Sequence, residues 1–189
     1  MRPIFTIHAG EFLVGEYLER SFKNIQIWVP AKDSGIDLLV TNYRNTKAVS
    51  LQVKFSRDFL TTHMENIFQQ PMRACGWFTL NRAKIAKSTA DVWVFVLIGS
   101  KKRSYDFVIL RPSDLLKHLD IIHGETHAEQ KPIQSYIWVT EGERCWETRG
   151  LKRIERLQIA QNTFRNPDRD FTTYLNNWDR VRDLNREGK

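Results

Sequence analysis

The pattern of apolar and polar residues predicts a helix followed by three strands in the first third of the chain. Residues 8–22 carry an apolar stripe at helical spacing, formed by Leu13, Val14, Tyr17 and Leu18. Residues 25–29 alternate between apolar and polar, which is typical of a short strand. Residues 36–41 and 48–55 are predicted as two further strands, because the polar residues between them supply turn chemistry.

The rest of the chain also alternates between strand and helix patterns. Residues 92–98 form a continuous apolar run, which predicts a central strand buried on both faces. Residues 61–72 are predicted as a helix that stops near Pro71. The other expected elements are a turn at 101–103, a strand at 105–110, a helix at 112–119 with Ser113 as N-cap, and a hairpin of 133–139 with 144–147. Three tryptophans in strand patterns are predicted as core: Trp28, Trp93 and Trp138.

This order of elements predicts an α/β protein in which helices flank a mixed β-sheet. We expect one domain, with residues 1–150 as its α/β core. Residues 151–189 are basic and helical in pattern, with a break near Pro167. They are predicted as a C-terminal helical extension packed on the same domain.

Composition favours a cytoplasmic protein without a membrane segment. No apolar run approaches the roughly 18 residues of a transmembrane helix. Glu11 and Glu16 lie where a signal peptide would need apolar residues. The two cysteines are too few for a disulfide framework or a cysteine-based zinc site. The formal net charge of +7 suits a polyanionic partner, although it could also serve solubility alone.

Three polar residues converge in the predicted hairpin of residues 36–55. Gln52 and Lys54 are two apart on a strand and therefore share a face. A turn symmetric about residues 44 and 45 puts Asp37 directly opposite Gln52, on that same face. The other face is then apolar throughout, as a core face should be: Ile36, Leu38, Val40, Leu51, Val53 and Phe55.

This hairpin resembles the active site of the PD-(D/E)XK nuclease superfamily, which has the restriction-endonuclease-like fold. The resemblance lies in Gly35-Ile36-Asp37, a gap of fourteen residues, and then Gln52-Val53-Lys54. It covers roughly the first hundred residues. Many family members also place a glutamate on the preceding helix, where this chain has Glu11. Ile36 replaces the family's proline, and Gln52 replaces its second acid, which is similar to the methyl-directed restriction branch.

The resemblance implies a site for Mg²⁺ or Mn²⁺, and the residue types suit it. Mg²⁺ prefers oxygen ligands, often one or two carboxylates with several waters. Asp37 would be the principal ligand, and Glu11 would add a second carboxylate directly or through water. The Gln52 amide and the Val53 carbonyl can offer further oxygens. Glutamine lacks the charge of glutamate, so we expect weaker metal binding. Lys54 would orient the attacking water or stabilise charge on the phosphate.

Other residues compete for these roles. Asp33 lies in the loop before Asp37 and is an alternative metal ligand, although a loop aspartate often caps a turn. The spacing of His123 and His127 suggests zinc, but the sequence offers no evident third ligand and Gly124 disfavours a helix there. Cys75 is interpreted as a small core residue, since no neighbour in sequence would activate it.

Basic residues occur in three groups that would contact nucleic-acid phosphates. A solvated surface is the alternative for each of them. Trp77, Phe78 and Trp146 could stack on bases or pack in the core. The three groups are Arg82, Lys84 and Lys87; Lys101, Lys102 and Arg103; and Arg149, Lys152, Arg153 and Arg156.

The leading hypothesis is a Mg²⁺-dependent endonuclease that hydrolyses phosphodiester bonds in DNA. One alternative is a nucleic-acid-binding module of the same fold without catalysis, which Gln52 favours. Another is an interaction subunit that docks a protein through the basic residues from Leu151 onward. RNA as a substrate and a homodimer as the assembly both remain open at this point.

Overall fold

A computed structural model describes residues 8–31, 35–56, 65–99, 104–124 and 132–186. The helices and strands, in chain order, are α1 (Ala9–Ser21), β1 (Ile25–Trp28), β2 (Leu38–Asn42), β3 (Ala48–Phe55), α2 (Asn66–Gln69), β4 (Met72–Leu80), α3 (Arg82–Ala86), β5 (Val92–Gly99), β6 (Tyr105–Leu110), α4 (Pro112–His123), β7 (Ile133–Thr140), β8 (Cys145–Glu147), α5 (Arg153–Ala160) and α6 (Asp179–Arg182). None of the helices in these ranges is long and apolar enough to cross a membrane.

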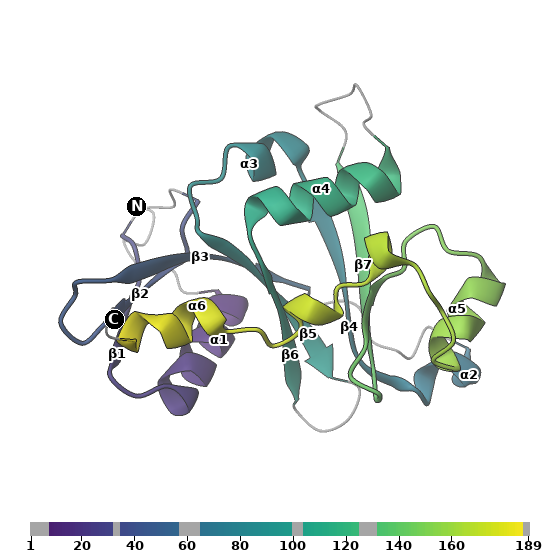
Figure 1. The fold of residues 1–189 in the computed structure, drawn as a ribbon, viewed down its shortest axis with the longest axis horizontal. Coiled ribbons are helices and arrows are strands. Elements are labelled where there is room, and N and C mark those ends of the chain that lie inside the picture. The colour runs from purple at the N-terminus through teal and green to yellow at the C-terminus, as the bar shows by residue number, and fades with distance from the viewer. Residues whose placement is uncertain (1–7, 32–34, 57–64, 100–103, 125–131, 187–189) are drawn as a thin grey trace.

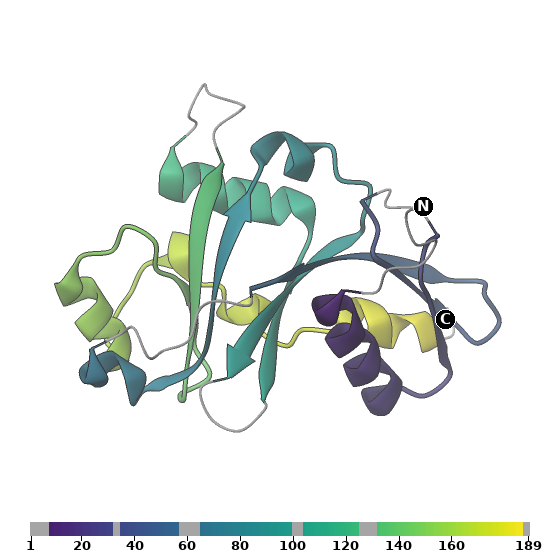
Figure 2. The ribbon, with the colours of Figure 1, turned by 180° about the vertical axis from the view of Figure 1, so that it is seen from behind.

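The strands form one mixed sheet of eight strands, with helices on both sides of it (Figures 1 and 2). The strand order is β1-β2-β3-β5-β4-β7-β8, and β6 pairs with β5. β3 and β5 run parallel, whereas the other strand pairs of the described residues are antiparallel. The prediction of an α/β fold with a mixed sheet flanked by helices is therefore confirmed.

One edge of β5 is shared between two strands that separate from each other. β6 pairs with residues 93–98 of β5, so β3 and β4 both use the opposite edge. β3 pairs with residues 92–96, and β4 pairs only at Ile98 and Gly99. β4 pairs with β7 at Met72 and from Ala74 to Leu80, but its pairing with β5 ends at Cys75. The sheet thus opens into a fork between β3 and the second half of β4.

The faces of β5 belong to two separate parts of the hydrophobic core, as its continuous apolar run predicts. Trp93, Phe95 and Leu97 pack beneath α3 and α4. Val92, Val94 and Val96 pack on the other face, which α1 covers. A third apolar cluster lies where α2 and α5 cover β4, β7 and β8. In Figure 1, α3 and α4 lie above the sheet and α5 lies at the far right.

Two predictions for the middle of the chain are wrong. The predicted helix at 61–72 is reduced, in its described part, to α2, and the strand β4 begins at Met72. Ser113 is not the N-cap of α4, because the helix begins at Pro112 and Arg111 is the cap residue. Trp93 and Trp138 are buried as predicted, but Trp28 is 50% exposed, because Ile27 takes the face of β1 that packs on the core and the next side chain points to the other face.

The C-terminal segment is less helical than its sequence pattern indicates. From the end of α5 to residue 186, where the described part ends, it contains only short 3₁₀ turns and the four-residue helix α6. It nevertheless packs closely on the sheet, since Phe171 and Trp178 are almost completely buried in the two main clusters. Asn176 joins it to β6, because its side chain accepts from the N–H of Phe107 and donates to Asp106.

Candidate active site

The predicted hairpin register is confirmed over most of β2 and β3, and it breaks at Asp37. Leu38 pairs with Leu51 and Leu39 with Ser50, as predicted. The N–H of Asp37 also donates to the carbonyl of Leu51, at 2.8 Å. Two residues therefore oppose Leu51, as in a β-bulge. Asp37 consequently does not lie in register opposite Gln52, which corrects the prediction.

The same irregularity redirects the predicted core face of the hairpin. Leu38, Val40, Leu51 and Val53 are buried in the cluster beneath α1, as predicted. Phe55 is partly buried there. Ile36 packs against the opposite cluster instead, because regular pairing starts only at Leu38.

The break in register places the Asp37 carboxylate at the edge of β3. Asp37 Oδ2 accepts a hydrogen bond from the backbone N–H of Val53 at 2.6 Å. In an antiparallel ladder, one residue directs its N–H and its carbonyl to the same edge. The Val53 carbonyl is therefore directed to the edge that holds this carboxylate. Two of the predicted metal ligands, the Asp37 carboxylate and the Val53 carbonyl, therefore lie at the same edge of β3.

Gln52 and Lys54 lie on the face of β3 that adjoins α3. Gln52 is paired with Trp93 of β5, and Lys54 with Phe95. Lys54 Nζ lies 5.0 Å from the centre of the Trp93 ring, a distance at which cation–π attraction acts. The Trp93 indole in turn donates to Ser88 Oγ at 2.9 Å. The lysine ammonium is thus held over a fixed aromatic surface.

Glu11 belongs to helix α1, which packs against the same end of β3 from the opposite side of the sheet. It is buried in the first turn of α1, and its Oε2 accepts from the backbone N–H of His8. The preceding residue is Gly10, where an added Cβ would lie 2.6 Å from the Cβ of Phe55 and 3.2 Å from a methyl of Val53. The helix therefore packs directly against the residues on either side of Lys54.

A pocket of about 650 Å³ adjoins this site in the fork of the sheet. Gln52 and Lys54 form one wall, and the end of β4, helix α3 and the following loop form the other. Its described lining is Gly35, Gln52, Lys54, Thr79, Leu80, Asn81, Ala83, Lys84, Lys87, Ser88, Thr89 and Trp93. Half of these residues were not expected from the sequence, because β4 was not predicted and nothing then placed its end opposite β3: Thr79, Leu80, Asn81, Ala83, Ser88 and Thr89.

The basic residues that were predicted to contact nucleic-acid phosphates lie in several places. Lys84 and Lys87 line the pocket, whereas Arg82 forms an ion pair with Asp120 of α4. Arg153 on α5 pairs with Glu65, and this contact lowers the pKa of the Glu65 carboxyl. Lys152 is exposed at the start of the same helix. Lys101, Lys102 and Arg103 lie outside the described residues, as does Asp33.

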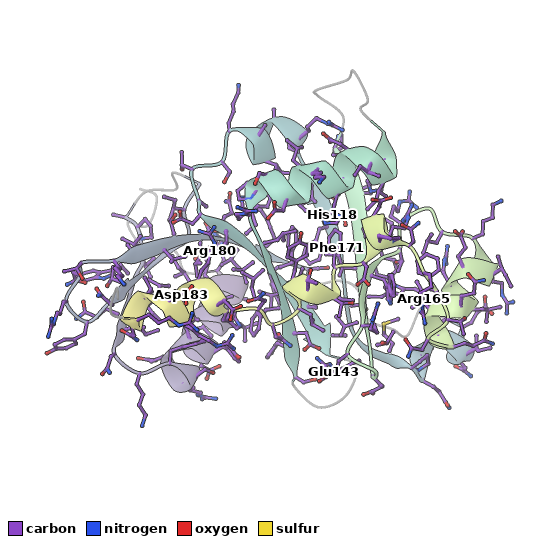
Figure 3. All side chains as sticks on the ribbon, in the orientation of Figure 1. His118, Glu143, Arg165, Phe171, Arg180 and Asp183 are labelled. Atoms are coloured by element: carbon purple, nitrogen blue, oxygen red, sulfur yellow. The ribbon has the colours of Figure 1, made fainter. Side chains whose placement is uncertain are left out.

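The histidines do not form a zinc site in the described parts of the chain, where no three His, Cys, Asp or Glu side chains cluster as metal ligands. His118 packs 4.9 Å from the Phe171 ring, ring centre to ring centre (Figure 3). Its Nδ1 lies 2.7 Å from the carbonyl oxygen of Asp168. His123 lies beside the buried Glu147. His63 and His127 are outside the described residues.

The cysteine and aromatic residues that were considered for catalysis or base stacking are buried or partly buried. Cys75 is 1% exposed, and burial raises the pKa of its thiol to about 11, which opposes a nucleophilic role. Trp146 and Phe78 are buried within the core clusters. Trp77 is partly buried, and its indole donates to Gln134. Among these, Trp77 alone retains substantial exposed surface.

Comparisons of the chain with protein-family models, with curated proteins and with solved structures found no match.

Proposed function

We propose that this protein is a Mg²⁺-dependent endonuclease that hydrolyses phosphodiester bonds in DNA, with a core of the restriction-endonuclease-like fold. The observation that carries the proposal is the bond from the Val53 N–H to Asp37, which brings a carboxylate beside the strand containing Gln52 and Lys54. The sequence order of helix, antiparallel strands and a further strand parallel to β3 supports the same assignment.

The donor set fits Mg²⁺ better than a softer metal. Asp37, Glu11, the Gln52 amide and the Val53 carbonyl offer only oxygen, and Mg²⁺ accepts few protein ligands because it keeps several waters. When bound, the ion would lower the pKa of a coordinated water and so supply the nucleophile. Mn²⁺ accepts the same donors.

The chain's own groups supply orientation and charge. The Val53 N–H fixes the position of the Asp37 carboxylate, so that residue needs little rearrangement on binding. Lys54 lies in β3 next to Val53. Its positive charge would hold a phosphate oxygen or orient the attacking water. Its position over Trp93 limits the conformations of its long side chain.

A DNA-binding module without catalysis is the second candidate, because Gln52 offers no negative charge to the metal. Metal binding separates the two functions. The module would bind DNA equally well with Mg²⁺ or with chelator and would leave the DNA intact.

The test compares cleavage of supercoiled plasmid by the wild-type protein, Lys54→Ala and a matched control, Lys117→Ala. Lys117 is an exposed residue of α4 and does not line the pocket. We expect nicking or cutting by the wild type and Lys117→Ala with Mg²⁺ or Mn²⁺, and none with chelator or with Lys54→Ala. Equal cleavage by the two variants would contradict the role of Lys54.

A further inference from the structure

The charged side chains in the described lining of the pocket beside the candidate active site are all positive. Its described lining includes three lysines, Lys54, Lys84 and Lys87, and no aspartate or glutamate. The remaining polar side chains are neutral hydrogen-bonding groups, from Gln52, Thr79, Asn81, Ser88 and Thr89. Lysine ammoniums act as compact point charges for phosphate. The pocket therefore suits an anionic group.

The size of the pocket limits what can enter it. A volume of about 650 Å³ is that of a site for a small molecule, so the pocket can hold a nucleotide-sized group but cannot enclose a duplex. A nucleic acid can present such a group in two ways, as the end of a strand or as a base turned out of the stack.

The lining favours a phosphate over a base. A base held in a protein pocket is usually stacked on an aromatic or apolar face. The ring in the described lining is Trp93, which is only 2% exposed and has Lys54 over it. No stacking surface is thus open in this part of the pocket. The lysines offer more to a terminal phosphomonoester, whose charge at neutral pH is about −1.5 to −2, than to a singly charged diester.

We propose that this pocket binds the terminal phosphomonoester of a DNA strand, through Lys84 and Lys87, next to the site of hydrolysis. This inference rests on the proposed function and adds a preference among DNA substrates: closed circular DNA is cut without this contact, and nicked or linear DNA is bound more tightly where a strand end carries a phosphate. Gln52 and Lys54 belong both to the pocket wall and to the candidate active site, so a bound end lies beside the reacting groups.

The test measures binding in chelator, where no cleavage occurs. Fluorescence anisotropy would compare one labelled oligonucleotide duplex with a 5′-phosphate, a 3′-phosphate or hydroxyl ends only. We expect the wild type to bind one phosphorylated end about tenfold more tightly than the hydroxyl form, as one or two additional charge-assisted bonds would give. Which end is preferred identifies the source of the phosphate.

Two double variants complete the test. Lys84→Gln/Lys87→Gln removes two charges from the pocket, and Lys23→Gln/Lys117→Gln removes two from exposed positions elsewhere. The preference for a phosphorylated end should disappear only in the first. A fourth duplex, with hydroxyl ends and one unpaired base, tests the alternative that the pocket takes a base. Equal binding of the three fully paired duplexes by the wild type would overturn the proposal. So would tightest binding of the fourth duplex, or a phosphate preference that survives in the first variant.

The proposed function and this inference can fail separately. A phosphate preference in a protein that never cleaves DNA with metal would remove the endonuclease and leave the pocket assignment standing. Metal-dependent cleavage with no phosphate preference would do the reverse. All four lysines are exposed, and unchanged thermal unfolding of both double variants would show that the substitutions leave the fold intact.

Discussion

The ammonium group of Lys54 lies 5.0 Å from the centre of the Trp93 ring, across the parallel pair of β3 and β5. A cation–π contact of this kind contributes about 0.5–2 kcal/mol, depending on its solvation. It also limits the rotamers of a long side chain, whose charge would otherwise sample many positions. Through Trp93, strand β5 thus orients a lysine that belongs to the neighbouring strand β3.

Lys54→Arg separates charge from shape at this position. Arginine keeps the positive charge and the contact with Trp93, but its planar fork replaces a compact ammonium. We expect the initial rate of plasmid cleavage to fall about tenfold in Lys54→Arg and about 100-fold or more in Lys54→Ala. Equal rates for the two variants would mean that charge at this position has no part in the reaction.

Asp37→Asn and Asp37→Ala should affect function alike and stability differently. Both remove the carboxylate charge, so both should lose Mg²⁺ binding measured by calorimetry, together with cleavage. Asparagine can still accept the Val53 N–H through its amide oxygen, whereas alanine leaves that donor without Asp37. Chemical denaturation should therefore show Asp37→Ala to be about 1–3 kcal/mol less stable. Retained metal binding in Asp37→Asn would contradict the ligand assignment.

Gln52→Glu should strengthen metal binding. The substitution adds one negative charge to β3 at the residue before Val53, whose N–H binds Asp37, and it preserves the side chain's size. We expect the Mg²⁺ concentration for half-maximal cleavage to fall by about tenfold, which corresponds to about 1.4 kcal/mol of added attraction. Thr79→Glu offers a control, because it adds the same charge at an exposed position of the pocket rim. An equal shift in both variants would show a general effect of charge.

Arg73→Ala should destabilise the protein far more than Glu143→Ala. Arg73 donates two hydrogen bonds to Asp106, at 2.8 and 2.6 Å, and Asp106 is only 5% exposed. Removing the arginine leaves a buried charge poorly compensated, which typically costs about 3–5 kcal/mol. Glu143 binds the same arginine from an exposed position, so its loss should cost about 1 kcal/mol or less. Urea denaturation measures both, and similar losses would contradict this account.

Alkaline pH should weaken the fold through Cys75. Burial raises the pKa of this thiol from 9.0 to about 11. Below the unfolded value the thiol is protonated in both states, so its stabilising contribution is complete. Between those two values the unfolded chain loses its proton first, and stability therefore falls as the pH rises. The free energy of unfolding at pH about 8 and about 10 should differ less in Cys75→Ala than in the wild type, and equal differences would exclude this cause.

The hairpin could be predicted from sequence because its apolar face and its turn agree on one register. Leu38, Val40, Leu51 and Val53 must all face the core, and a slip of one residue would expose them. The bulge at Asp37 could not be predicted in this way. It depends on a side chain that bonds the edge of β3, and no apolar pattern records such a bond.

The pocket could not be predicted because its second wall is β4. That strand contains Arg73 and Gly76 and follows the short helix α2, so its pattern does not resemble a buried strand. Its partner β7 lies more than fifty residues away in sequence, and their pairing provides the stabilisation that local propensity does not. The path of the C-terminal segment could not be predicted for the same reason. It is set by the burial of Phe171 and Trp178 against the sheet, and not by a helical pattern in the sequence.

The close approach of α1 to β3 makes the candidate site sensitive to a residue that has no functional group. At Gly10 even a methyl group would overlap the Cβ of Phe55, an atom that cannot move without its backbone. Any larger residue would shift the helix away and carry the Glu11 carboxylate with it, while every oxygen donor remained chemically intact. The seating of α1 on β3 thus depends on the absence of a side chain at Gly10, and a variant that fails to cleave DNA need not lack any of the proposed reacting groups.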